Sequence, residues 1–183
     1  MKIFYKIFIS FFILTSLVLF NSCDPFEDTY ITLSMNTEFN ISGVGIGLDL
    51  SKKENFCLSK FDDYNDNKDK LEEIRYISSA YLTIDSTQEL RGDSLTLTLY
   101  EGDGLTLLFK YVVPNFNANQ YLNKPLEIKL TPKEIDDINA YLKNPREDKC
   151  FVATLKVSNV QSTNPFFQLN SKIEFLSELK IRP

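Results

Sequence analysis

The sequence predicts a mainly β protein: an antiparallel β-sandwich of about seven to eight strands with one short helix, Pro132 to Lys143. From Tyr30 to Ile41, apolar and polar residues alternate strictly, as in a half-buried strand. Two more alternating runs flank a glycine-rich tetrad, Glu101 to Gly104, which is the pattern of a β-hairpin. Many short strands joined by turns, with a single helix, favour a sandwich.

The first half of the chain supplies most of the predicted strands. After Gly43 the apolar positions change phase, which predicts a bulge or hairpin at that glycine. A second strand is expected over Tyr76 to Asp85, with a helical turn before it near Leu71 to Ile74. The hairpin around the tetrad then has apolar alternation on both sides, at Leu95, Leu97 and Leu99 and at Leu105, Leu107 and Phe109.

The second half contains the helix between strands. A strand over Leu126 to Leu130 leads into Thr131-Pro132-Lys133-Glu134, which has a capping residue, a proline at the first helical position and a glutamate at the third. Asn144-Pro145 ends the helix. Two further strands follow, one over Phe151 to Val157 and one over Lys172 to Ile181.

The N-terminus carries an export signal. Lys2 and Lys6 precede an apolar run, Ile7 to Phe20, that is too short for an ordinary membrane-spanning helix. A basic start, a short apolar core and the small residue Ser22 before Cys23 fit a secretory signal peptide.

Residues Leu19-Phe20-Asn21-Ser22-Cys23 resemble the lipobox of bacterial lipoproteins. The resemblance implies lipidation of Cys23 and cleavage just before it. Residues 1–22 are then the signal peptide, 23–29 the lipid anchor with a short tether, and 30–183 a single β-sandwich domain. The expected location is the bacterial cell envelope, with the outer membrane preferred; the acidic residues after Cys23 leave the choice of membrane and leaflet open.

Composition excludes several functions. The chain has 20 Lys and Arg against 25 Asp and Glu; Lys2 and Lys6 lie in the signal peptide, so the mature charge is near −7. Nucleic acid is therefore not an expected partner, because phosphates require clustered basic residues. The chain contains no histidine, which excludes Ser-His-Asp and Cys-His catalysis and imidazole-ligated metals. We expect a protein that is not an enzyme.

Two cysteines remain besides Cys23. Cys57 and Cys150 lie in a chain expected to reach an oxidising compartment, where a disulfide could join them. The alternative is two buried free thiols. A bridge that closes so long a loop would stabilise the fold by about 4 to 5 kcal/mol.

The densest set of oxygen donors is a candidate calcium site. Asp63, Asn65, Asn67 and Asp69 alternate as ligands do in calcium loops. An EF-hand loop, however, needs glycine where this chain has Lys68. A solvated acidic loop is the alternative, because Asp and Asn favour turns. Calcium is the one cofactor that the sequence suggests.

Phe166 and Phe167 follow a polar stretch, so they are candidate contacts for a partner at a loop tip, or else one ring packs into the core. The leading hypothesis is a non-enzymatic envelope lipoprotein that binds another envelope protein or an extended ligand, for example as an accessory subunit of an envelope complex. One alternative is a carrier or sensor of a small apolar ligand held between the sheets. The other is a calcium-dependent surface adhesin or glycan binder.

Overall fold

Eight strands make up most of the computed structural model, which describes residues 28–87 and 89–182. The strands are β1 (Thr29–Val44), β2 (Leu50–Cys57), β3 (Leu71–Ser86), β4 (Arg91–Glu101), β5 (Leu107–Asn117), β6 (Leu126–Glu127), β7 (Cys150–Ser158) and β8 (Phe166–Ile181). The helical segments are η1 (Leu58–Lys60), α2 (Asp62–Asn67), η2 (Lys68–Lys70), η3 (Ala118–Tyr121) and α3 (Pro132–Tyr141). Among the helices in these residues, none has the length and apolarity needed to cross a membrane.

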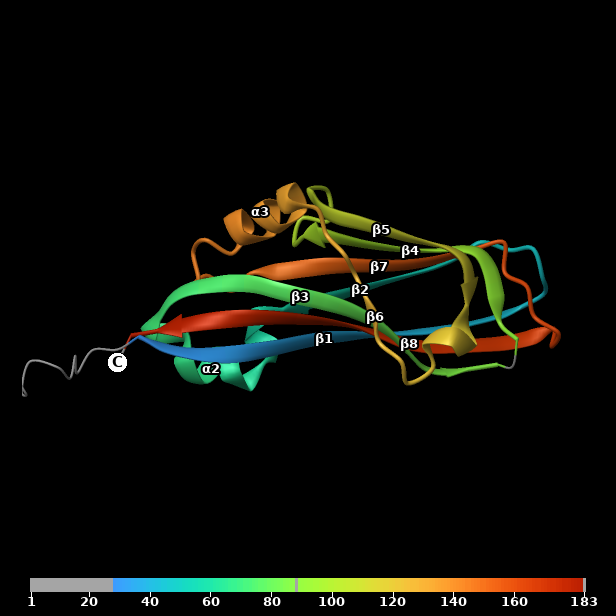
Figure 1. Cartoon of the computed structure of the whole chain (residues 1–183), viewed down its shortest axis with the longest axis horizontal. Coiled ribbons are helices and arrows are strands. Elements are labelled where there is room, and N and C mark those ends of the chain that lie inside the picture. Colours follow the sequence, from blue (N-terminus) through green and yellow to red (C-terminus); the bar gives the residue numbers. More distant parts are fainter. Residues whose placement is uncertain (1–27, 88, 183) are drawn as a thin grey trace, which may run out of the picture.

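The strands form two four-stranded antiparallel sheets, ordered β1-β8-β3-β6 and β2-β7-β4-β5, that lie one above the other (Figure 1). β1 and β2 lie in different sheets, and so do β7 and β8. This order is that of a jelly roll, a double-sheet form of the β-sandwich. The predicted fold class, a mainly β antiparallel sandwich with few helices, is confirmed; besides the predicted helix, α3, the structure has a second short α-helix, α2.

Alternate side chains of β1 are buried, as the sequence pattern predicts. Leu33 and Phe39 are fully buried, while the even-numbered side chains between them are exposed. β1 pairs with β8 in an unbroken register from Thr29↔Ile181 to Val44↔Phe166. The prediction of a bulge or hairpin at Gly43 is wrong: the strand continues through Gly43, and the chain then crosses to the other sheet as β2.

The hairpin around the glycine-rich tetrad is confirmed. β4 and β5 are antiparallel neighbours, and Tyr100 lies opposite Leu107 next to the turn. Asp103 organises this turn, because its carboxylate accepts hydrogen bonds from the backbone N–H groups of Leu105 and Thr106 at 2.8 and 3.0 Å. These bonds hold the pKa of Asp103 below its ordinary value.

The predicted short helix begins as expected. The Thr131 hydroxyl accepts a hydrogen bond from the N–H of Glu134, whose carboxylate accepts one from the N–H of Thr131, which completes a capping box. The helix ends at Tyr141. The predicted helical turn at Leu71 to Ile74 is wrong, because these residues begin β3. Of the strand expected over Leu126 to Leu130, only Leu126 and Glu127 pair, with β3.

Aromatic rings fill the space between the sheets. Phe56, from β2, stacks on Phe151 with ring centroids 5.2 Å apart and on Phe175, from the other sheet, at 5.7 Å. A cavity of about 10 Å³ remains beside them, lined in part by Met35 and Ser177. A bound drug-sized ligand needs roughly 300 to 1,000 Å³. Around this aromatic cluster, the described residues therefore leave too little room for the ligand of the apolar-ligand alternative.

Tyr81 makes the fold sensitive to alkali. Burial raises the pKa of this phenol to about 12, although its hydroxyl pairs with Thr83. In the unfolded chain a tyrosine ionises near pH 10. The stability that the fold gains from burying Tyr81 as the neutral phenol is therefore complete below about pH 10 and is lost as the pH rises towards 12.

We expect Tyr81→Phe to reduce the alkaline loss of stability by about 1 kcal/mol at about pH 11. Urea unfolding of the wild type and the variant at about pH 8 and about pH 11 measures this difference. An identical pH dependence in the two proteins would show that Tyr81 ionises normally.

Candidate functional site

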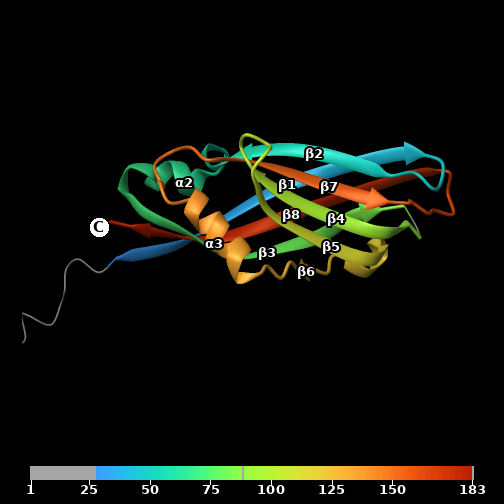
Figure 2. The ribbon, with the colours of Figure 1, turned by 90° about the horizontal axis from the view of Figure 1, so that it is seen from above.

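The two ends of the sandwich differ in character. At the near end, defined by Thr29 and Ile181, lie α2 and α3; at the far end lie the loops 45–49 and 159–165 and the segment 118–125, which begins with η3 (Figures 1 and 2). β1 joins the two ends. At about 3.3 Å per residue, its 16 residues span about 50 Å.

Apolar side chains are exposed at the far end. We call Val44, Ile46, Leu48 and Phe166 the far-end patch; their exposed fractions are 60%, 68%, 48% and 68%. Val44 and Phe166 are direct partners across the β1–β8 ladder, so their side chains lie on the same face of the sheet. Beside them is an open hollow of about 550 Å³ that also involves Ser42, Thr87 and Gln168. Exposed apolar groups gathered in this way are typical of a contact surface.

The loop that carries Ile46 and Leu48 is fixed by backbone hydrogen bonds. Gly45 N–H donates to the carbonyl of Pro165 at 2.9 Å, and Gly47 N–H donates to that of Val160 at 2.7 Å. Both glycines have positive φ, 104° and 77°, a conformation that other residues rarely adopt. The patch is therefore held in place by the fold before any partner binds.

Phe166 and Phe167, predicted together as partner contacts, have opposite environments. They begin β8 instead of occupying a loop tip, and successive strand residues point to opposite faces. Phe166 is exposed and belongs to the far-end patch, whereas Phe167 is only 3% exposed and packs into the core. Val44, Ile46 and Leu48 were not predicted as contacts, because their alternation resembled that of a buried strand. Gly45 and Gly47 between them were the available signal of a turn.

Phe167 explains why residue 43 is glycine. A Cβ atom at Gly43 would lie 2.4 Å from Cζ of the Phe167 ring, far inside van der Waals contact. Gly43→Ala should therefore push the ring aside and lower the free energy of unfolding by about 1 to 3 kcal/mol. Thermal melting measures the loss, with the exposed neighbour Ser42→Ala as the control. Equal melting temperatures for the two variants would contradict this packing.

The four predicted calcium ligands do not converge. Asp63, Asn65 and Asn67 lie on α2 and Asp69 on η2, instead of on an extended loop. Side chains two apart on a helix point in different directions. The Asn67 amide also donates to the carbonyl of Asp63 at 2.9 Å. The acidic segment is thus helical, and the structure does not gather the oxygen donors that the calcium hypothesis needs.

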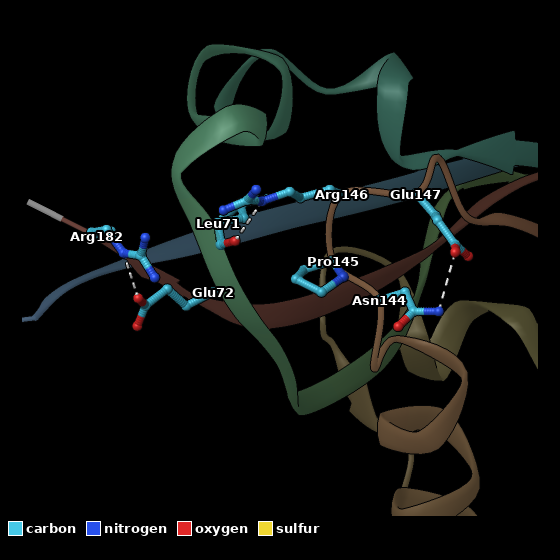
Figure 3. Close-up of a pocket in the computed structure, with 7 residues that line it drawn as sticks. All are labelled: Leu71, Glu72, Asn144, Pro145, Arg146, Glu147 and Arg182. Atoms are coloured by element: carbon cyan, nitrogen blue, oxygen red, sulfur yellow. Dashed lines mark hydrogen bonds and ion pairs between the residues drawn. The ribbon is translucent and has the colours of Figure 1, made fainter.

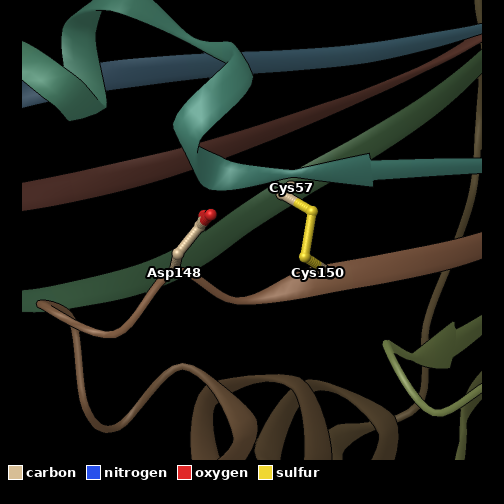
Figure 4. Close-up of side chains that lie close together, drawn as sticks. All are labelled: Cys57, Asp148 and Cys150. Carbon is tan, nitrogen blue, oxygen red and sulfur yellow. A yellow bond between two sulfur atoms is a disulfide. The ribbon is translucent and has the colours of Figure 1, made fainter.

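Cys57 and Cys150 form the predicted disulfide, between residues directly opposite each other on β2 and β7. The Asp148 carboxylate lies close to both sulfurs (Figure 4). This carboxylate accepts hydrogen bonds from the backbone N–H and hydroxyl of Ser59, at 2.9 and 2.6 Å. The sulfurs are bonded to each other and so are not thiolate ligands. The disulfide and the hydrogen bonds between Asp148 and Ser59 hold the loop before β7 against η1.

A second hollow, of about 490 Å³, lies at the near end (Figure 3). Both of its arginines are engaged by other groups of the protein: Arg182 pairs with Glu72 at 2.9 Å, and Arg146 donates to the carbonyl of Leu71 at 3.3 Å. The ion pairs with Arg182 and Lys180 hold the pKa of Glu72 below its ordinary value. This is a polar, internally paired surface, unlike the far-end patch.

The predicted lipidation site, Cys23, lies outside the described residues. Asp28, the first of them, pairs with Lys180 at 2.9 Å, which fixes the start of the domain at the near end. Any anchor at Cys23 therefore joins the domain at the end opposite to the far-end patch.

Comparisons with known proteins add little about function. No family model matches the sequence, and no curated protein matches it. Among solved structures, the decameric BFDV capsid protein is 9% identical, with 82% of this chain and 99% of that chain covered and a TM-score of 0.40. Desmodium yellow mottle tymovirus is also 9% identical, with 85% and 84% covered and a TM-score of 0.34. Likenesses this distant carry no argument about what the chain binds.

Proposed function

We propose that the protein is a non-enzymatic lipoprotein of the bacterial cell envelope, anchored through lipidated Cys23, that binds another envelope protein through the far-end patch. The observation that carries the proposal is a set of exposed apolar side chains at one end of the sandwich: Val44 at the end of β1, Phe166 at the start of β8, and Ile46 and Leu48 on the loop after β1, which backbone hydrogen bonds hold in place. Exposed apolar side chains that lie together mark contact sites on soluble proteins, and aromatic residues such as Phe166 are enriched at protein interfaces.

The anchor and the far-end patch are compatible in geometry. Because Asp28 is held by Lys180, the tether is the stretch from Cys23 to Asp28, which can extend to at most about 20 Å, at roughly 3.5 Å per residue. The far end lies about 50 Å beyond Thr29, the length of β1. A domain that stands on its near end therefore presents the patch away from the lipid, where a protein partner can reach it.

The double variant Ile46→Ser/Phe166→Ser tests this proposal. Mild crosslinking in the native bacterium, followed by purification and quantitative mass spectrometry, should recover one specific partner with the wild type and at least about tenfold less with the variant. Leu105→Ser is the matched control, because Leu105 is 83% exposed but lies in the hairpin at the near end. A protein that is solitary, or one whose partner is recovered equally with all three forms, would overturn the proposal.

A further inference from the structure

The outer strands of the two sheets differ in how they are protected. An unpaired sheet edge is a template for another strand, and proteins usually block it with charges, proline, short strands or a covering element. β6 is only two residues long. β2 carries Lys52, Lys53 and Glu54 in succession. On β5 there is Pro114, and the backbone N–H of Lys110 donates to the Glu134 carboxylate of α3 at 3.4 Å.

β1 has none of these protections. It runs for 16 residues without proline, lysine or arginine, and Glu38 is its one charged side chain. Its register with β8 contains no bulge. Among residues 28–87 and 89–182, no strand pairs with its other edge. β1 is therefore a long, regular and almost uncharged edge.

The hydrogen-bond pattern identifies the free backbone groups. In an antiparallel ladder, opposed residues alternate between pairs that exchange hydrogen bonds and pairs that do not. Gly45, which continues the β1–β8 register by one position, donates to the carbonyl of Pro165. The odd-numbered residues of β1 therefore bond to β8, and the even-numbered residues turn their N–H and C=O groups to the open edge.

We infer that this edge binds an extended segment of the partner protein, which adds a strand beside β1. The inference rests on the proposed function and specifies how the partner binds. The edge is continuous with the far-end patch, because β1 ends at Val44. Main-chain hydrogen bonds supply the affinity of such a strand, and side chains at alternate positions supply the specificity. Exposed Glu38 selects a segment with a lysine or arginine opposite it, and the mature charge near −7 also favours a basic partner.

A second copy of this chain fits the edge less well. Two copies paired antiparallel through β1 would have their Thr29 ends about 50 Å apart along the strands. The tether to Cys23 reaches about 20 Å, so both copies could not stand on one membrane by their near ends.

Proline substitutions test the inference directly. Ser34→Pro and Asn40→Pro each remove an N–H that faces the open edge and bonds to nothing in β8, so the domain should fold with a nearly unchanged melting temperature. A photo-crosslinking amino acid at position 36 of the full-length protein, in the native bacterium, should give one discrete adduct. Either proline should reduce its yield at least about tenfold. Asn40→Thr keeps the N–H and should retain the adduct, whereas Glu38→Lys should weaken it.

The failing outcomes separate the two proposals. The same cross-linker at position 46 reports on the far-end patch. An adduct at position 46 with none at 36, or with one at 36 that survives both prolines, would overturn strand addition and leave the proposed function standing. An adduct between two copies of this chain would overturn the partner strand, because it would show that the edge binds a second copy. No adduct at either position would overturn both proposals.

Discussion

Replacement of Phe56 by alanine should lower the free energy of unfolding by about 3 to 5 kcal/mol, the usual cost of truncating a buried phenylalanine. Phe56 is 2% exposed, and its ring lies against Phe151 of its own sheet and Phe175 of the other. The substitution removes these contacts and leaves a cavity that the rigid strands cannot close. Urea unfolding at neutral pH measures the change.

The same substitution at the surface provides the control. Phe166 is 68% exposed, so Phe166→Ala should change stability by no more than about 0.5 kcal/mol, although it removes part of the far-end patch. Similar losses for Phe56→Ala and Phe166→Ala would contradict the division between core and contact surface on which the proposed function depends.

Removal of the disulfide should have an effect of similar size. Cys57 and Cys150 are 93 residues apart in sequence, and a cross-link that closes a loop of this length stabilises a fold by about 4 to 5 kcal/mol on the chain-entropy model. For a domain of this size, the loss corresponds to a melting temperature lower by roughly 10 to 20 °C. The double variant Cys57→Ala/Cys150→Ala shows this effect in thermal melting.

Reduction of the wild type with a thiol reagent should reproduce the melting temperature of the double variant. The reagent should leave the double variant itself unaffected, because no other disulfide is expected in the domain. A wild type whose melting temperature does not change on reduction would contradict a stabilising role for the bridge.

The sequence was informative wherever a pattern is local. Alternation identified β1, β4, β5 and β7, because a strand buried on one face needs an apolar residue at every second position. The capping box located the start of α3 for a similar reason. The jelly-roll order could not be derived in this way, because β8 lies between β1 and β3, and no local signal specifies partners so far apart in the chain.

The candidate site was predictable only in part. Phe166 was identified as a contact, but Val44, Ile46 and Leu48 were read as strand residues, because turn and strand share the same alternation at this corner. The acidic segment suggested extended calcium ligands, yet buried Tyr64 helps to hold it as α2: its ring lies in the core, and its hydroxyl donates to the carbonyl of Glu147 at 3.1 Å. Tertiary packing, not local composition, decided both cases.

The orientation of the domain, and so the exposure of the far-end patch, depends on the proposed lipid at Cys23. Mass spectrometry of the N-terminal peptide, prepared from protein extracted from membranes with detergent, tests this most directly. We predict a mature chain that begins at Cys23 and carries acyl groups, and a Cys23→Ala variant that no longer fractionates with membranes. A mature chain with a different N-terminus, or an unmodified Cys23, would contradict the account.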